Sequence, residues 1–453
     1  MDPKVKARLL EQDRRYVWHP FTQMKDYAER NHLLIERAEG IYLYDADGNA
    51  YYDTISSWWV NVHGHAHPRL KQAIREQVDR MDHVMFSGLT HAPGIELAAK
   101  LVEITPPGLS RVFYSDNGST AVEVALKMSF QYWKQAGKPS KKTFIYLEHS
   151  YHGDTLGAVS VGGVEQFHAL FRPLLFTAHR VPSPGAPVPL PGSFGRPANA
   201  AEAAADPAAH SLRAVRELLE ASADDIAGVI VEPMLQAAGG MLLYPAEALR
   251  ELRELCSQFA VHLIADEVAV GFGRTGAMFA CAHAGVSPDL LCLSKGLTAG
   301  LMPLSVTLCT DDIYQAFYDD YETQKTFFHG HSFTGNPLAA AVALESLRIF
   351  EDEGLLQHVG GAARHLAAEM QRQLGSRPRI TGLRSLGMVG AFELDAAPER
   401  RIGFEAYLEG LKHGLFLRPL GNTLYFWLPL CTTQEQISDI VTRTAAVLER
   451  LEL

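Results

Sequence analysis

Lys295 follows an apolar run, Leu290–Leu293, whose composition predicts a buried strand. A side chain just past such a strand lies at the sheet edge where open α/β folds bind their ligands. Burial disfavours the ammonium form of a lysine, and the neutral amine is a nucleophile toward carbonyl groups, which is the chemistry of a Schiff base. A surface lysine is the simpler interpretation of Lys295 alone, so the neighbouring motifs decide between the two.

Three carboxylates also follow apolar runs. Asp266 and Glu267 come directly after residues 261–265, and Glu232 comes after residues 227–231. A buried carboxylate needs a partner, or it takes up a proton. A structural ion pair is the default explanation, and the sharper hypothesis is that Asp266 faces the protonated ring nitrogen of a pyridine cofactor. Polar residues after three strands, including the one that precedes Lys295, predict a cleft at one sheet edge.

A polar turn, Asp116–Thr120, separates an expected strand from an expected helix. Free N–H groups and the positive end of the helix make such a turn a phosphate site, to which the Ser119 and Thr120 hydroxyls add donors. An ordinary N-cap explains the same residues equally well. Tyr151, in a loop after another strand, either covers the core or stacks on a planar ring.

Two further motifs are assigned no chemistry. Residues 271–276 match GxGxxG, but two acids separate them from their strand, and Asp289 comes too soon to complete a dinucleotide fingerprint. His63, His65 and His67 alternate as HxHxH, yet the glycine, alanine and proline that follow them indicate a turn. A structural loop is therefore favoured over a metal site.

The composition excludes several classes of protein. With 453 residues, 47% hydrophobic and 21% charged, the chain is typical of a globular enzyme with a large core. The net charge of −11 argues against a nucleic-acid partner. No apolar run resembles a signal peptide or a membrane span. Five cysteines without a CxxC pair argue against disulfides and structural zinc, so we expect a cytoplasmic protein.

From Arg69 onward, expected strands and helices alternate, which predicts an α/β fold with a mainly parallel sheet sandwiched by helices. The expected strands are residues 111–115, 143–147, 227–231 and 261–265, with others near Leu290 and Leu304; the expected helices are residues 3–16, 118–135, 211–221, 246–259 and 338–351. Asp47-Gly48 predicts a hairpin turn between two short strands. Residues 181–210, rich in proline, alanine and glycine, are expected to form a long surface loop.

Taken together, the motifs resemble class III pyridoxal-phosphate aminotransferases in their order and spacing. These motifs are Ser115–Ser119, Tyr151–Gly153, Asp266–Glu267 with Gly271–Gly276, and Ser294–Gly296, and the match extends from Trp18 to Pro429. Residues 18–23 (WHPFTQ), the Trp58-Trp59 pair and residues 418–421 (RPLG) look more narrowly like the diaminopelargonate synthases, the 8-amino-7-oxononanoate aminotransferases of biotin synthesis.

The resemblance implies a fold type I transferase. Residues 1–65 would join a smaller α+β lobe built from both termini, residues 66–335 would form the large pyridoxal-phosphate-binding domain, and residues 336–453 the C-terminal small domain. It also implies a homodimer with shared active sites, whose other partners are a small-molecule amino donor and an oxo-acid acceptor.

The resemblance also implies roles for individual residues. Lys295 would bind pyridoxal 5′-phosphate covalently, Asp266 would pair with the ring nitrogen, and Tyr151 would stack on the ring; Lys295, Asp266 and Tyr151 are the expected catalytic residues. The expected cofactor-binding residues are these three together with Gly118, Ser119, Glu232 and Val268 of the same chain. Ser332 of the partner subunit completes the expected set.

The implied reaction converts 8-amino-7-oxononanoate to 7,8-diaminononanoate by ping-pong chemistry. A long aliphatic acid needs an apolar tunnel ended by a cation, for which Trp58, Trp59 and Arg418 are candidates, with Phe21 and Arg274 completing the expected substrate set. An internal ion pair is the alternative for Arg418. The tryptophans could be plain core, and on a strand only one of two neighbours could face inward.

Phe21 bears on the amino donor. Members that use S-adenosylmethionine usually carry tyrosine at this place, so phenylalanine favours L-lysine. Three other functions remain as alternatives: a broad ω-amine:pyruvate-type aminotransferase with the same cofactor residues, an aminomutase, and a non-catalytic cofactor-binding regulator. Intact Lys295 and Asp266 argue against the last.

Overall fold

The computed structural model describes residues 1–30, 32–185 and 206–451. The proline- and alanine-rich loop expected at 181–210 lies largely outside these ranges, since residues 186–205 are not described. Its described flanks are strand β6 (His179–Val181) and helix α10 (Pro207–Ser222), which begins four residues before the expected helix at 211.

The largest sheet in the described chain has seven strands in the order β4-β12-β11-β10-β7-β5-β6. Its other strands are β4 (Leu109–Ser115), β5 (Thr143–Leu147), β7 (Ile226–Val231), β10 (His262–Asp266), β11 (Leu290–Leu293) and β12 (Ser305–Thr310). All neighbours from β11 to β6 run parallel, and β12 is antiparallel to both β11 and β4. The expectation of a mainly parallel sheet is confirmed.

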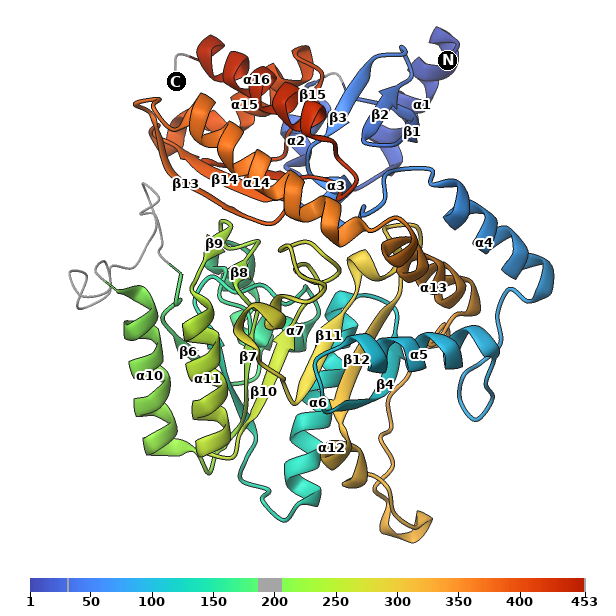
Figure 1. The fold of residues 1–453 in the computed structure, drawn as a ribbon, viewed down its shortest axis with the longest axis vertical. Coiled ribbons are helices and arrows are strands. Elements are labelled where there is room, and N and C mark those ends of the chain that lie inside the picture. Colours follow the sequence, from blue (N-terminus) through green and yellow to red (C-terminus); the bar gives the residue numbers. More distant parts are fainter. Residues whose placement is uncertain (31, 186–205, 452–453) are drawn as a thin grey trace.

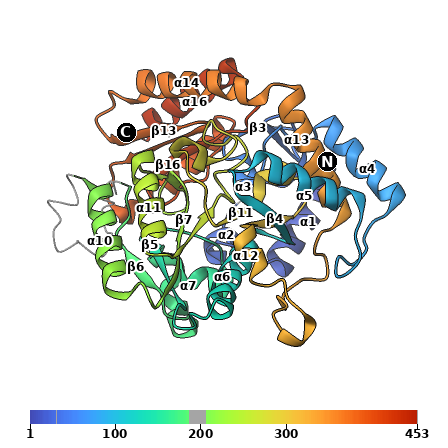
Figure 2. The ribbon, with the colours of Figure 1, turned by 60° about the horizontal axis from the view of Figure 1, so that its bottom comes forward.

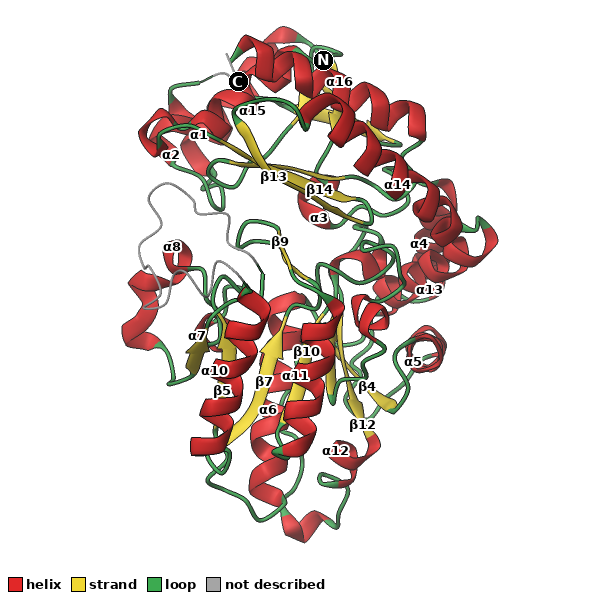
Figure 3. Cartoon of the chain, turned by 60° about the vertical axis from the view of Figure 1, so that its left-hand side comes forward, coloured by secondary structure: helices red, strands yellow, loops and turns green. Residues whose placement is uncertain are grey.

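Helices cover both faces of this sheet, because successive side chains of a buried strand point to opposite sides. Ile264 packs in the same cluster as helix α6 (Gly118–Gln135), whereas its neighbours Leu263 and Ala265 pack with α10 and α11 (Ala246–Gln258). Figure 3 shows α10 and α11 lying in front of the strands. The carboxyl ends of β7, β10 and β11 are thereby fixed between two helical layers.

Residues from both termini meet at the other end of the molecule. Strands β1 (Ile35–Glu39), β2 (Tyr42–Asp45) and β3 (Ala50–Asp53) form a sheet with β15 (Leu415–Phe416), and the hairpin expected at Asp47-Gly48 joins β2 to β3. Figures 1 and 2 show these blue strands beside the red C-terminal elements. This mixing is why we propose the division into residues 1–65, 66–335 and 336–453, with the first segment joining the third.

The C-terminal part contains a second, antiparallel sheet of β13 (Ile380–Leu386), β14 (Val389–Leu394) and β16 (Thr423–Trp427). Its helices are α14 (Leu355–Leu374), α15 (Ile402–Lys412) and α16 (Gln434–Arg450), of which α14 packs on β13, β14 and α16. Both β14 and β16 are buried along their whole length, so this sheet lies in the core of the C-terminal part.

The other α-helices of the described chain are α1 (Pro3–Tyr16), α2 (Met24–Ala28), α3 (Ser56–Trp59), α4 (Pro68–Arg80), α5 (Ala92–Ile104), α7 (Leu156–Ser160), α8 (Glu165–His168), α12 (Asp311–Gln315) and α13 (Pro337–Asp352). A short hairpin pairs β8 (Leu235–Gln236) with β9 (Leu242–Leu243). Helix α13 packs against α4 and α5 and connects the two parts. None of the helices in the described chain combines the length and apolar character needed to cross a bilayer.

Candidate active site

A cavity of about 630 Å³ opens at the carboxyl ends of β7, β10 and β11, beside the N-terminus of α6. It is where the sheet edge places the polar residues that follow each strand. The structure brings together at this cavity Gly118, Ser119, Tyr151, Glu232, Asp266, Val268, Lys295 and Trp59. The remaining candidates from the sequence, Phe21, Trp58, Arg274, Arg418 and Ser332, do not line it.

Lys295 reaches the cavity from the turn after β11, with its backbone in the left-handed region (φ 39°). Burial lowers the pKa of its ammonium group, while the negative charges of Asp266, Glu232 and Asp154 oppose that shift. Within the described chain the amine makes no hydrogen bond or ion pair, and its Nζ lies 5.3 Å from the centre of the Trp59 ring. An amine with a lowered pKa and no partner can attack a carbonyl group.

Asp266 ends β10 as a carboxylate that is only 4% exposed. Its Oδ2 lies 2.7 Å from His152 Nδ1, and its Oδ1 accepts a hydrogen bond from the Val268 N–H (3.0 Å). The buried Nε2 of His152 has no partner in the described chain. His152 and the Val268 N–H therefore hold the carboxylate in place, and Asp266 lines the cavity.

The next acid, Glu267, points away from the cavity. It accepts hydrogen bonds from the N–H groups of Ala280 and Cys281 at distances of 2.6 and 2.8 Å. Burial raises its pKa to about 7. Because successive residues of a strand face opposite sides, Asp266 and Glu267 have separate environments although they are adjacent in sequence.

Glu232 lies after β7 on the same side of the sheet as Asp266. Its two carboxyl oxygens accept from the N–H groups of Tyr151 and Ala237, each at 3.0 Å. Burial raises the pKa of this carboxyl to about 7, with a further rise from the charge of Asp266. Glu232 thus fixes the loop that carries Tyr151.

The turn before α6 is both an N-cap and a cradle of free donors. Asn117 accepts from the Thr120 N–H (3.1 Å) in a capping box. The N–H groups of Gly118 and Ser119 have no hydrogen-bond partner in the described chain, and they stand at the positive end of the helix. A Cβ at position 118 would lie 2.5 Å from Val268 Cγ1, so only glycine lets the backbone come this close.

Tyr151 lines the same cavity as this cradle. Its hydroxyl donates to Asp154 Oδ2 (2.8 Å), and its ring stacks in parallel with His168 at 6.2 Å. The Asp154 N–H donates in turn to Ser119 Oγ (3.2 Å). A flat ring, a buried acid, a free amine and a helix end with unused N–H groups fit a phosphorylated pyridine aldehyde of the size that the cavity admits.

The two tryptophans lie on a left-handed turn and not on a strand. Four consecutive residues, Ser56 to Trp59 (α3), have φ values of 51, 46, 70 and 74°. This conformation costs roughly 1–2 kcal/mol per L-residue, so surrounding contacts must maintain it. Trp59 is buried, stacks on Trp427 at 4.9 Å and donates from Nε1 to the Tyr425 hydroxyl (3.2 Å).

Trp58 faces outward from the same turn and is 38% exposed. Its ring contacts Phe21 edge-on at 5.6 Å, and the Arg418 guanidinium carbon lies 4.7 Å from its centre. Phe21 also meets Phe167 at 5.2 Å. Arg418 makes no hydrogen bond or ion pair with any described residue, so the internal ion pair considered for it is not present among them. The three residues form a separate aromatic and cationic cluster.

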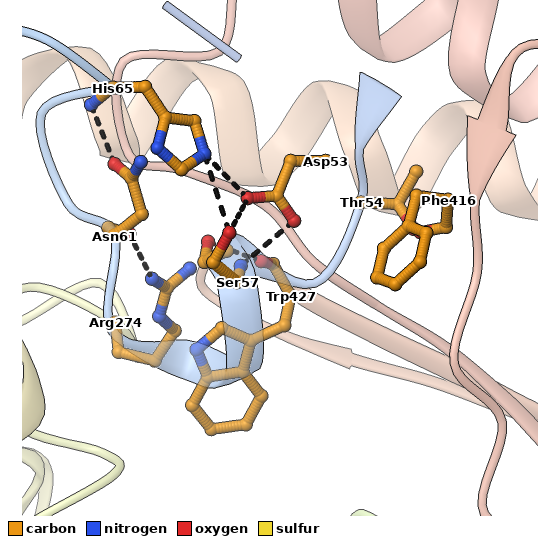
Figure 4. A network of polar contacts seen from close by, with 10 residues as sticks. Asp53, Thr54, Ser57, Asn61, His65, Arg274, Phe416 and Trp427 are labelled. Carbon is orange, nitrogen blue, oxygen red and sulfur yellow. Dashed lines mark hydrogen bonds and ion pairs between the residues drawn. The ribbon is translucent and has the colours of Figure 1, made fainter. Parts of the chain in front are cut away.

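Arg274 occupies a different place. It is 2% exposed, donates to the backbone carbonyls of Asn61 (3.2 Å) and Leu428, and packs over the Trp427 ring. Figure 4 shows it among the segments around the left-handed turn. Burial lowers its pKa to about 9. The GxGxxG match thus supplies an interior arginine that connects backbone segments.

Ser332 is exposed, and in the described chain its carbonyl accepts from His83 Nε2 (2.9 Å). The alternating histidines are also separated. His63 pairs with Ser346 Oγ (2.9 Å), whereas His65 pairs with Asp53 (2.8 Å). Among the described residues, no cluster of three or more histidine, cysteine or acidic side chains could hold a metal.

Three residues with direct contacts to this site were not singled out from the sequence. His152 contacts Asp266, Asp154 contacts both Tyr151 and Ser119, and Asp53 contacts the turn that carries the tryptophans. His152 and Asp154 stand in the same short loop as Tyr151, and that proximity is the signal that could have found them. Asp53 has no comparable signal.

Comparison with known proteins places the chain in a family. The profile of the family described as Aminotransferase class-III matches residues 24–448. A protein of Geobacter sulfurreducens named adenosylmethionine-8-amino-7-oxononanoate aminotransferase is 47% identical over 96% of this chain and 95% of its own length. A protein of Aquifex aeolicus with the same name is 41% identical over 100% and 99%.

Comparison with solved structures leads to the same family. The crystal structure of adenosylmethionine-8-amino-7-oxononanoate aminotransferase from Methanocaldococcus jannaschii has a TM-score of 0.91 at 35% identity, covering 99% of this chain and 100% of that one. An amine transaminase from an uncultivated Pseudomonas species, in its PLP-bound form, has a TM-score of 0.86 at 32% identity, covering 96% and 98%. The fold of this chain is therefore the fold type I of pyridoxal-phosphate enzymes. The chain belongs to the class III aminotransferases, enzymes that depend on pyridoxal phosphate.

Proposed function

We propose that this aminotransferase converts 8-amino-7-oxononanoate to 7,8-diaminononanoate, the step that makes the diamine precursor of biotin. The observation that carries the proposal is Arg418, whose guanidinium lies over the Trp58 ring without a carboxylate partner among the described residues. Such an arginine beside exposed aromatic rings suits a long aliphatic chain that ends in a carboxylate. The names of the Geobacter and Aquifex relatives support the same substrate.

The cofactor residues follow from the cavity. Lys295 would hold pyridoxal phosphate, the free N–H groups of Gly118 and Ser119 would bind its phosphate, and Val268 and Tyr151 would contact the two ring faces. Ser332 of the partner subunit would complete the phosphate site in a homodimer. Glu232 would act through the Tyr151 loop, whose N–H it accepts.

The chain's residues then divide the chemistry. Bound pyridoxal phosphate supplies a protonated ring that withdraws electrons from the substrate carbon next to nitrogen. Asp266, oriented by His152, holds the proton at the ring nitrogen. The Lys295 amine would be the general base that moves the proton from the substrate carbon to the cofactor carbon that carries the amine, and in the reverse direction in the opposite half of the reaction. Two half-reactions that share one site give ping-pong kinetics.

The donor is either L-lysine or S-adenosylmethionine. Phe21, which contacts Trp58 edge-on, offers no hydroxyl to a donor, and this favours L-lysine. The relatives' names support S-adenosylmethionine. Purified enzyme supplied with the oxo acid and each donor in turn discriminates between them, and turnover with S-adenosylmethionine alone would overturn the preference for lysine.

Changing Arg418 to alanine tests the acceptor. We expect kcat/KM for the oxo acid to fall roughly 10- to 100-fold, mainly through KM, because a charge-assisted hydrogen bond is worth about 1.5–3 kcal/mol. Arg443→Ala is the matched control, since Arg443 also lies over a ring, that of Tyr52, but pairs with Asp439 away from the cavity. Equal effects of the two changes would contradict the role of Arg418.

A broad ω-amine aminotransferase is the second candidate, favoured by neighbours such as the six-fold mutant of a thermostable omega transaminase from Pseudomonas jessenii (TM-score 0.88, 30% identity, covering 98% of each chain). Fast turnover of small amines with pyruvate, together with no reaction of the nine-carbon oxo acid, would select it over the proposed function.

A further inference from the structure

The left-handed turn of α3 brings the cavity and the Arg418 cluster together. Trp59 lies beneath the Lys295 amine, whereas Trp58 lies beneath the Arg418 guanidinium. The two side chains are neighbours in sequence, so the backbone conformation of this one turn sets both positions at once. The turn contains no glycine, the residue that adopts positive φ without steric cost.

Asp53 closes the turn from one side. Its Oδ1 accepts from the Ser57 N–H (2.8 Å), and its Oδ2 accepts from the Ser57 hydroxyl (2.7 Å). His65 Nε2 lies 2.8 Å from the same Oδ2, and the carboxylate itself is 0% exposed. Figure 4 shows the carboxylate between His65 and Ser57. A buried carboxylate is retained only where such donors offset its loss of water.

Strand β16 holds the turn from the opposite side. The Ser56 hydroxyl donates to the Trp427 carbonyl (2.6 Å), and the Trp427 N–H donates to the Thr54 carbonyl (2.8 Å). These bonds fix where the turn begins. Ser57 itself is contacted by Asp53 through both its N–H and its hydroxyl, and the hydroxyl also lies 3.5 Å from His65 Nε2. Strand β16 therefore holds the start of the turn. Backbone bonds from the Trp59 N–H to the Ile55 carbonyl (2.9 Å) and from the Val60 N–H to the Ser56 carbonyl (3.0 Å) close it, and Asp53 holds its middle at Ser57.

We propose that Asp53, supported by His65, is a positioning residue that acts through Ser57 to keep Trp59 under Lys295 and Trp58 under Arg418. The inference rests on the proposed function for its substrate, although not for its geometry. Without the carboxylate, residues 56–59 relax toward conformations that L-residues prefer. Both tryptophan side chains then leave their places, because the direction of each Cα–Cβ bond follows the backbone.

Asp45 provides a matched control for a merely structural carboxylate. It is 6% exposed and closes the β2–β3 turn of the same sheet, where it accepts from the Asn49 N–H (2.8 Å) and the Tyr51 hydroxyl (2.9 Å). It does not line the cavity. Asp53 and Asp45 thus share burial, secondary structure and type of bonding, and differ in what their turn carries.

The test compares Asp53→Ala, Asp53→Asn and Asp45→Ala as cofactor-loaded enzymes. For Asp53→Ala we expect KM for 8-amino-7-oxononanoate to rise at least about 10-fold and the pH midpoint of the cofactor's visible absorbance to shift, because small displacements of positioned groups have large kinetic effects. Asp53→Asn, which keeps one acceptor oxygen, should recover part of both. Asp45→Ala should lower Tm and leave both at wild-type values.

The outcomes separate the possibilities. If Asp53→Ala lowers Tm but leaves KM and the absorbance midpoint unchanged, Asp53 is structural and the proposal is wrong. If Asp53→Ala does not fold, Ser57→Ala removes the hydroxyl bond alone and should still raise KM about two- to fivefold on the same grounds; no change there also refutes it. If the wild-type enzyme does not use the oxo acid, the proposed function fails, and the absorbance midpoint still decides the role of Asp53.

Discussion

The two halves of the candidate site are built in different ways. In the strand-end half, Lys295 and Glu232 follow buried strands of one sheet, Asp266 is the last residue of another, and Gly118 begins a capped helix. In the turn half, Trp58 and Trp59 lie on a left-handed turn, and Arg418 comes from a segment far along the chain.

This difference suggests a division of labour. Side chains at strand ends are held by the backbone hydrogen bonds of the sheet, which suits groups that must keep their geometry during chemistry. Side chains on a strained turn depend on a few specific contacts, which suits a surface that selects a substrate. Changes in the first half should therefore lower kcat, and changes in the second half should raise KM.

The largest effect is expected for Lys295→Ala. Losing the amine removes both the covalent link to the cofactor and the general base, so turnover should fall by at least about 10⁴-fold. The visible absorbance of the linked cofactor should disappear with it. Lys141→Ala is the matched control, because Lys141 is also buried but donates to the Ile226 carbonyl (3.2 Å). Turnover that survives in Lys295→Ala would contradict the assignment of Lys295 as the general base.

The adjacent acids of the strand-end half, Asp266 and Glu267, should respond differently to substitution. Asp266→Asn should lower kcat roughly 10²- to 10³-fold, the usual effect of losing one preorganised electrostatic contact. Glu267→Gln should leave kcat per bound cofactor unchanged and cost about 1–3 kcal/mol of stability, because it disturbs the bonds to Ala280 and Cys281. Similar kcat losses in both variants, measured beside thermal unfolding, would contradict the assignment.

The two halves also differ in how far the sequence predicts them. An apolar run followed by a polar residue is a local signal, so the strand-end cluster of Asp266, Glu232 and Lys295 could be anticipated. The left-handed turn has no such signal, because Ser56 is anchored by Trp427, more than 350 positions away. The role of Arg274 could not be predicted for a different reason. Its GxGxxG motif is a local signal, but the carbonyls that it contacts, those of Asn61 and Leu428, lie far from it in the sequence.

The smallest effect concerns the pH dependence of stability in the strand-end half. The pKa of Glu232 is raised by burial to about 7, above its ordinary value of 4.5. The folded chain therefore holds this proton more tightly than the unfolded chain. The stabilisation is complete below about pH 4.5 and is lost as the pH rises through about 7, with a slope of at most about 1.4 kcal/mol per pH unit.

Glu232→Gln should remove this contribution. The difference in unfolding free energy between wild-type apo-protein and the variant should therefore shrink or reverse between pH 5 and 7.5, as measured by denaturant unfolding at several pH values. Glu267, whose pKa burial also raises to about 7, contributes a second slope of the same sign that Glu267→Gln should remove independently. Parallel stability curves for wild type and Glu232→Gln would mean that the carboxyl is ionised throughout. The hydrogen bonds from Tyr151 and Ala237 would then outweigh burial.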